Sequence, residues 1–193
     1  GKAWQAAAVA QGCSISDEAV LKIKGANRDL AYSILKEDAG GGFDIIKGRD
    51  FREEYIQRHL KENGLTKKKG LDNLLKFLRE NNIKTCLATS TKREVAMRYL
   101  KMAKVEEYFD DTTCGDEIEN GKPAPDIFLK SAQKLNVDIA DCLVLEDSIN
   151  GINAGILSGA HVIMVPDTIL SDEEICKKTD AVKDDLDEVI EWI

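Results

Sequence analysis

The stretch CLVLEDSINGINAG, residues 142–155, decides the fold. Its apolar start ends abruptly in Glu146 and Asp147, and a helix-like segment follows. This order is typical of a buried parallel strand whose carboxyl end points carboxylates into a crevice, where open α/β sheets place their chemistry. An Asp before a helix is also a good N-cap, so either acid could simply cap the following helix. The rest of the chain must decide between these two interpretations.

Helices and short apolar strands alternate on both sides of this stretch, from residue 67 to residue 193. The predicted helices cover residues 71–81, 92–101, 126–135, 150–158 and 186–192. The predicted strands cover residues 84–88, 110–114, 142–145, 160–165 and 181–182. Such alternation predicts an α/β fold, in which helices cover both faces of a parallel, Rossmann-like sheet.

Residues 1–66 carry a helical pattern throughout and need no strand. The segment 3–10 consists almost wholly of helix formers, and Ser16 or Asp17 can cap a second helix. We therefore predict a small all-helical domain over residues 1–66 and an α/β core domain over residues 67–193.

The composition is that of an ordinary globular protein, with 43% hydrophobic and 32% charged residues. The net charge of −8 argues against a nucleic-acid partner, because neutralising phosphates needs a concentrated basic face. No stretch is long and apolar enough for a membrane span, and residues 1–12 do not resemble a signal peptide. We therefore expect a cytoplasmic protein that binds neither nucleic acid nor membranes, and we expect a monomer.

The cysteines and histidines point to structural roles. No Cys-x-x-Cys pair is present, and His59 and His161 are isolated from other potential metal ligands. Several cysteines lie in strand-like apolar runs, which favours reduced, buried thiols over disulfides or a zinc site. The cysteines are five in number, at Cys13, Cys86, Cys114, Cys142 and Cys176.

Hydroxyl side chains follow the predicted strand at residues 84–88. At Thr89, Ser90 and Thr91 an apolar run gives way to hydroxyls at the predicted start of a helix. Hydroxyls and free backbone N–H groups at such a point suit a phosphate. A plain Ser/Thr helix cap explains the same residues equally well.

Lys122 lies between Gly121 and Pro123 in a loop rich in acids. Because Pro restricts the backbone on either side of it, this lysine is held rigidly and could neutralise a phosphoryl group and a carboxylate nucleophile together. Glu146 and Asp147 supply hard oxygen ligands, which suit Mg²⁺. The three polar sites together favour phosphate and metal chemistry.

These residues carry a resemblance to a known family. Thr89, Lys122 within GKPAPD, and Glu146-Asp147 within LEDSINGINAG resemble the second, third and fourth motifs of the haloacid dehalogenase superfamily. The helical segment before them is similar to the cap domain of the β-phosphoglucomutase-like branch of that superfamily. The resemblance covers essentially the whole chain. Each motif is weak alone, and their order and spacing make the match specific.

The resemblance implies a mechanism in which an aspartate attacks phosphorus with the help of Mg²⁺, and the aspartyl-phosphate is then discharged. It implies that Thr89 hydrogen-bonds the transferring phosphoryl group, with help from the Ser90 backbone. Lys122 would offset the charge of nucleophile and phosphate. Asp147 would bind Mg²⁺, and Glu146 would ligate the ion or orient one of its waters.

The chain departs from the family at the first motif. No Asp-x-Asp occurs before Thr89, and the chain starts inside the first helix of the cap. We therefore expect that the first, central strand of the sheet, together with the nucleophile, is absent from these residues. Its loss would leave a slot of unpaired backbone groups. By itself, the chain of 193 residues is then expected to be poorly folded and inactive.

For the parent protein, the resemblance implies a phosphatase or a sugar-phosphate mutase. In a mutase, a cap loop like residues 24–28 would hold the far phosphate, with Arg28 and Lys24 as substrate contacts, although a solvated turn explains this segment as well. The sequences around Thr89 and Lys122 look more like those of hydrolases, which favours a phosphatase for a small phosphorylated metabolite. A catalytically inactive binding protein is the alternative from another class.

Overall fold

The computed structural model describes residues 1–167, 174 and 177–193. The chain forms two compact units, Gly1–Thr66 and Lys67–Ile193. Each unit has its own hydrophobic core.

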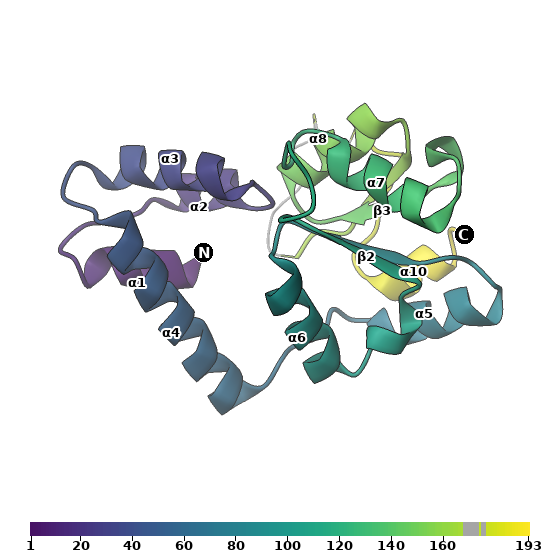
Figure 1. Cartoon of the computed structure of the whole chain (residues 1–193), viewed down its shortest axis with the longest axis horizontal. Coiled ribbons are helices and arrows are strands. Elements are labelled where there is room, and N and C mark those ends of the chain that lie inside the picture. The colour runs from purple at the N-terminus through teal and green to yellow at the C-terminus, as the bar shows by residue number, and fades with distance from the viewer. Residues whose placement is uncertain (168–173, 175–176) are drawn as a thin grey trace. The chain divides into compact units, whose positions relative to one another are not determined.

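The first unit is all-helical within its described residues (Figure 1). Side chains that accept N–H hydrogen bonds start three of the helices, and these side chains belong to Ser16, Asn27 and Asp44. Trp4 packs edge-on against Tyr32 and Phe43 in the core. The helices are α1 (Lys2–Val9), α2 (Asp17–Ile23), α3 (Arg28–Ala39) and α4 (Ile45–Asn63).

The second unit alternates helices and strands as predicted, with element ends shifted by a few residues. Its helices are α5 (Leu71–Glu80), α6 (Arg93–Ala103), α7 (Asp126–Leu135), α8 (Ile149–Ser158) and α10 (Leu186–Ile190). Its strands are β1 (Cys86–Thr89), β2 (Asp111–Cys114), β3 (Leu143–Glu146), β4 (His161–Met164) and β5 (Ala181–Val182). Short 3₁₀ turns at Glu106–Tyr108 and Ile139–Asp141 precede β2 and β3.

All strand pairs of the described residues are parallel, which confirms the predicted fold class. Among the described residues, the strands form a two-stranded sheet, β1-β2, and a three-stranded sheet, β3-β4-β5. Each of the four β1 residues is only partly buried. A parallel strand covered on all sides is normally buried, so β1 has an incompletely covered environment.

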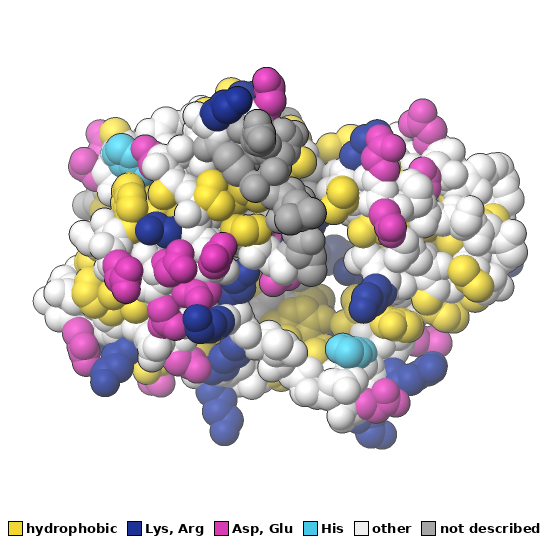
Figure 2. Space-filling model, turned by 180° about the vertical axis from the view of Figure 1, so that it is seen from behind, with side chains coloured by type: hydrophobic (Ala, Val, Ile, Leu, Met, Phe, Trp, Pro, Cys, Tyr) yellow, Lys and Arg dark blue, Asp and Glu magenta, His cyan; other side chains and the backbone are white. Residues whose placement is uncertain are grey.

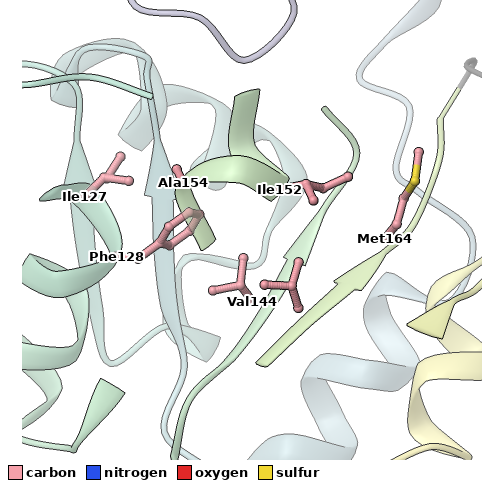
Figure 3. Packing of buried hydrophobic residues seen from close by; sticks show 7 residues of the cluster. Ile127, Phe128, Val144, Ile152, Ala154 and Met164 are labelled. Atoms are coloured by element: carbon pink, nitrogen blue, oxygen red, sulfur yellow. The ribbon is translucent and has the colours of Figure 1, made fainter. Parts of the chain in front are cut away.

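Helices pack on both faces of the strands (Figure 1). Side chains alternate along each strand, so Val144 of β3 faces α7 and α8, whereas Leu143 and Leu145 face α5 and α10. Figure 3 shows Phe128 and Ala154 gathered with Val144 between the two helices and the strand. This apolar cluster packs against β3, whose carboxyl end is Glu146.

The expectation of buried thiols holds for Cys114 alone among the described cysteines, since the others are partly buried. On the face shown in Figure 2, acidic and basic side chains lie beside one another rather than in one broad basic area. No helix among the described residues is long and apolar enough to cross a membrane. The described thiols are free, at Cys13, Cys86, Cys114 and Cys142. Cys176 lies outside the described residues.

Candidate active site

A buried ion pair lies at the carboxyl end of β3. Lys122 donates to Glu146, and their side chains are only 5% and 9% exposed. The Lys122 ammonium also lies 4.8 Å from the centre of the Phe128 ring. A charge removed from water is stable only where partners satisfy it, so each member of the pair requires the other.

The Glu146 carboxylate also sits at the start of α8. Its Oε2 atom accepts hydrogen bonds from the backbone N–H of Asp147 at 3.1 Å, and from the N–H and hydroxyl of Ser148 at 3.4 and 3.1 Å. Together with Lys122, these donors engage both oxygens of the carboxylate. The positive end of a helix dipole favours a negative charge at this place.

The interpretation of either acid as the helix cap is wrong. Ser148 is the N-cap of α8, and its hydroxyl accepts from the N–H of Gly151 at 3.1 Å. Ser148 is 1% exposed, so its hydroxyl makes this hydrogen bond away from solvent. The Ser side chain is short enough to close the first turn of the helix, so Ser148, and neither acid, is the N-cap residue.

Gly151 makes room for the Glu146 carboxylate. A Cβ atom at this position would lie 2.1 Å from Cδ of Glu146, far inside van der Waals contact. Alanine normally forms helix better than glycine does. Gly151 is therefore needed here for space and not for backbone freedom.

Asp147 follows Glu146 directly and is half-buried. Its carboxylate is a hard oxygen donor, which fits a Mg²⁺ ligand. The Glu146 oxygens already accept from Lys122, from the backbone N–H groups of Asp147 and Ser148 and from the Ser148 hydroxyl, which suits a supporting role. The donor set therefore fits Mg²⁺ through Asp147, with Glu146 as a supporting residue.

Thr89 ends β1, and its hydroxyl accepts a hydrogen bond from the Thr91 N–H at 3.2 Å. Helix α6 begins only at Arg93, and its N-cap is Lys92, which makes no side-chain cap hydrogen bond. The alternative of a Ser/Thr helix cap is therefore wrong for this segment. Thr89 and Ser90 are both half-buried at the strand end.

The loop after β2 connects the ends of three strands. The Gly115 N–H donates to the Thr91 carbonyl at 3.0 Å, and a Cβ atom on Gly115 would lie 2.3 Å from the Ser90 carbonyl oxygen. Further along the same loop, Lys122 reaches Glu146 at the end of β3. The carboxyl ends of β1, β2 and β3 are thus linked through this loop, and the polar residues predicted at the strand ends belong to one edge.

Glu117 is a charged residue of this edge that the sequence analysis did not single out. It is paired with Arg93 at 2.6 Å and with Lys134 at 2.7 Å. Partial burial alone would raise the pKa of Glu117, but the hydrogen bonds from Lys134, Arg93 and the Cys114 N–H outweigh it and lower the pKa to about 2. Its carboxylate therefore stays ionised far into the acid range.

Stability should depend on the ionisation of Glu117. Because its pKa is lowered from 4.5 to about 2, the stabilisation is complete above pH 4.5 and is lost as the pH falls towards 2. We expect a contribution on the order of 2 kcal/mol near neutral pH, after allowing for solvent screening. Urea unfolding of wild type and Glu117→Gln across this pH range should show their difference shrinking on acidification.

The expected decrease of the stability difference at low pH reflects the net effect of all charged groups near Glu117. A difference that stays constant between pH 5 and pH 2.5 would contradict it. The neighbouring groups are Arg93 on α6, Asp111 and Cys114 on β2, Asp116 beside it, and Lys130 and Lys134 on α7.

Lys24 and Arg28 belong to the first unit. Lys24 is the C-cap residue of α2, and Arg28 opens α3 with an exposed side chain 3.2 Å from Asp29. Thr89 and Lys122 belong to the second unit. Their predicted contact with a substrate stays a prediction.

The parallel α/β fold and the polar residues at the strand ends indicate one family of proteins, and the comparison with known families gives the same family. Residues 2–165 match the model of the haloacid dehalogenase-like hydrolases. The chain belongs to this family, and its neighbours of known structure include members of the β-phosphoglucomutase-like branch.

Several relatives carry phosphatase names. A Drosophila melanogaster protein named probable pseudouridine-5′-phosphatase is 40% identical over 116 residues, covering 57% of this chain and 50% of its own length. A phosphorylated carbohydrates phosphatase of Thermotoga maritima is 38% identical over 104 residues, or 54% of this chain and 46% of its own. The chain thus spans about half the length of these curated relatives.

One solved structure superposes on nearly the whole chain. β-Phosphoglucomutase from Clostridium difficile is 26% identical and superposes with a TM-score of 0.78. The match covers 97% of this chain and 84% of the other. The all-helical first unit and the α/β second unit therefore occur together in that relative.

Proposed function

We propose that the protein is a Mg²⁺-dependent phosphatase that acts on a small phosphorylated metabolite, such as a sugar phosphate. The observation that carries this proposal is the buried Lys122–Glu146 pair, which lies directly beside Asp147. A fixed ammonium with a second carboxylate next to it in the chain suits a phosphate group with a bound Mg²⁺. The phosphatase names of the relatives support the same reaction class.

In this proposal, the residues at the strand ends divide the work. The Thr89 hydroxyl donates to a phosphoryl oxygen with help from the Ser90 backbone, and Lys122 offsets the negative charge that builds up during transfer. Asp147 holds Mg²⁺, and Glu146 holds Lys122 in place. When bound, Mg²⁺ would polarise the phosphoryl oxygens and lower the barrier to attack.

We further propose that an aspartate outside these 193 residues is the nucleophile. Its carboxylate oxygen would form a bond to phosphorus while the ester P–O bond breaks and the leaving alcohol takes up a proton. Water would then break the aspartyl-phosphate bond and release inorganic phosphate. The incompletely covered β1 strand and the division between β1 and β3 are consistent with an additional strand between them.

A sugar-phosphate mutase is the second candidate, favoured by the structural likeness to β-phosphoglucomutase. A mutase passes the phosphoryl group to another hydroxyl of the sugar, whereas a phosphatase passes it to water. In the mutase, Arg28 and Lys24 of the first unit would hold the second phosphate. The cytoplasmic location and the monomeric state stay predictions from the sequence.

The test begins with the complete coding sequence, from which the protein is expressed. The purified protein is assayed on sugar phosphates and nucleotides with Mg²⁺, and both phosphate release and isomerised product are measured. We expect phosphate release that EDTA abolishes and that Asp147→Asn lowers on the order of 10²-fold or more. The exposed Asp141 provides a control, since Asp141→Asn should leave the rate unchanged.

The possible outcomes separate the two candidates. Isomerised product without phosphate release would favour the mutase. Full phosphatase activity in the presence of EDTA would contradict the role of Mg²⁺, and unchanged activity of Asp147→Asn would contradict the assignment of Asp147.

A further inference from the structure

The start of the β2–α7 loop carries more ionic contacts than an exposed turn needs. Glu117 Oε1 accepts from Arg93 Nε and Nη2 at 3.0 and 2.6 Å, and its Oε2 accepts from Lys134 Nζ at 2.7 Å. The Cys114 N–H donates to Oε1 at 3.0 Å. One carboxylate therefore joins the start of α6, the end of β2 and the body of α7.

A second set of contacts ties the same loop to the segment after β1. Asp116 accepts from the N–H of Arg93 at 3.0 Å and so supplies a cap to α6 from another part of the chain. Gly115 approaches the Ser90 carbonyl so closely that no side chain fits between them. Thus the loop that carries Lys122 is anchored directly to the segment that follows Thr89.

We propose that Glu117 is a positioning residue, which holds the β2–α7 loop against the β1–α6 loop and thereby fixes Lys122 in relation to Thr89. The proposal rests on the proposed function in one respect, namely that Thr89 and Lys122 bind the same phosphate. Its structural content does not depend on that reaction.

The charge of Glu117 is essential to this role. Glutamine has nearly the same shape, but it would leave Arg93 and Lys134 without their shared anion. Both cations also donate to the Thr112 carbonyl and would stay beside the loop. Lys134 would keep Asp111 at 3.4 Å, whereas Arg93 would lose its ion-pair partner. Partly buried charges without a partner are costly, and the start of the loop should therefore loosen.

A metal site is a poorer explanation for the same cluster. Among the described residues, Cys114, Asp116 and Glu117 are the group whose ligand atoms lie within 4.8 Å of one another. However, Arg93 and Lys134 engage both oxygens of Glu117, and these cations would repel a metal ion. The cluster is therefore better described as a clamp between two loops.

Chemical labelling of Lys122 tests the proposal. This lysine is 4% exposed, so an amine-acylating reagent should modify it slowly in the wild-type protein. We expect Glu117→Gln to raise its labelling rate about fivefold or more, because the loop opens more often. Mass spectrometry would follow Lys122 together with the exposed Lys101 as an internal reference.

Two variants serve as controls. Glu119→Gln removes an exposed acid from the same loop and should leave the labelling of Lys122 unchanged. Val189→Ala trims the core between α5 and α10 and lowers stability without touching the clamp. Equal labelling of Lys122 in Glu117→Gln and wild type would overturn the proposal, as would an equal increase in Val189→Ala.

The labelling result stands apart from the proposed function. If the protein releases no phosphate from any substrate but Glu117→Gln still exposes Lys122, the proposed function fails and the positioning role holds. If the protein is a phosphatase, Glu117→Gln should lower kcat more than it raises KM, since Lys122 acts mainly on the transition state. An unchanged kcat would count against the link between the clamp and catalysis.

Discussion

Replacing Lys122 by methionine is expected to lower the free energy of unfolding by about 3 to 5 kcal/mol. Methionine keeps most of the side-chain volume beside Phe128, so the loss reflects charge rather than packing. The Glu146 carboxylate, which is 9% exposed, would be left without its cation. Under the proposed function, phosphate release should also fall on the order of 10³-fold.

The double variant Lys122→Met with Glu146→Gln separates stability from catalysis. Removing both charges should recover most of the lost stability, because no uncompensated ion remains. It should not recover phosphate release, since the ammonium is still missing. Lys101→Met, at an exposed pair 3.9 Å from Glu106, should change stability by no more than about 0.5 kcal/mol. A similarly small effect for Lys122→Met in urea unfolding would refute the account of a buried pair.

Gly151→Ala is expected to destabilise the protein by about 2 to 3 kcal/mol, although the same change within a helix usually stabilises by about 1 kcal/mol. The added Cβ would lie 2.1 Å from Cδ of Glu146, so the carboxylate must leave the start of α8. Four donors hold that carboxylate, and its displacement also breaks the pair with Lys122. Gly151→Ala is therefore expected to destabilise the protein, whereas helix propensity alone predicts that it stabilises.

A double-mutant cycle tests the cause of this effect. In a background of Lys122→Met and Glu146→Ala, the added methyl group has no carboxylate to displace, so Gly151→Ala should become neutral or stabilising. Gly41→Ala is the matched control, because a Cβ atom there has nothing within 4 Å. A penalty for Gly151→Ala that persists in the altered background would place the clash elsewhere, most simply in the helix packing.

The elements and the edge that carries the polar residues were predictable from local patterns. The helix over residues 126–135 and the strand before Glu146 follow from apolar periodicity alone. The parallel arrangement follows from their alternation, and the position of Thr89 and Asp147 follows from the strand ends. These features depend on short segments and hardly on long-range partners.

The partners of the charged residues could not be predicted in the same way. The sequence pattern predicts a phosphate and a nucleophile as the partners of Lys122, whereas within these residues its ion-pair partner is Glu146. Glu117 looked like one acid among several in its loop, because Arg93 and Lys134 are distant in the sequence. Which ions meet depends on tertiary packing, and a sequence pattern reports only on near neighbours.

The division of the strands has a mechanical consequence. In the described part of the chain, β1 and β3 share no ladder hydrogen bonds, although Ala88 and Val144 pack in one apolar cluster. A ladder fixes the register of two strands, whereas apolar packing is non-directional and resists sliding only weakly. The bridge from Lys122 to Glu146 adds a directional contact across this division. Within these 193 residues, the directional contact across the division is thus electrostatic, and the proposed additional strand would add ladder hydrogen bonds to it.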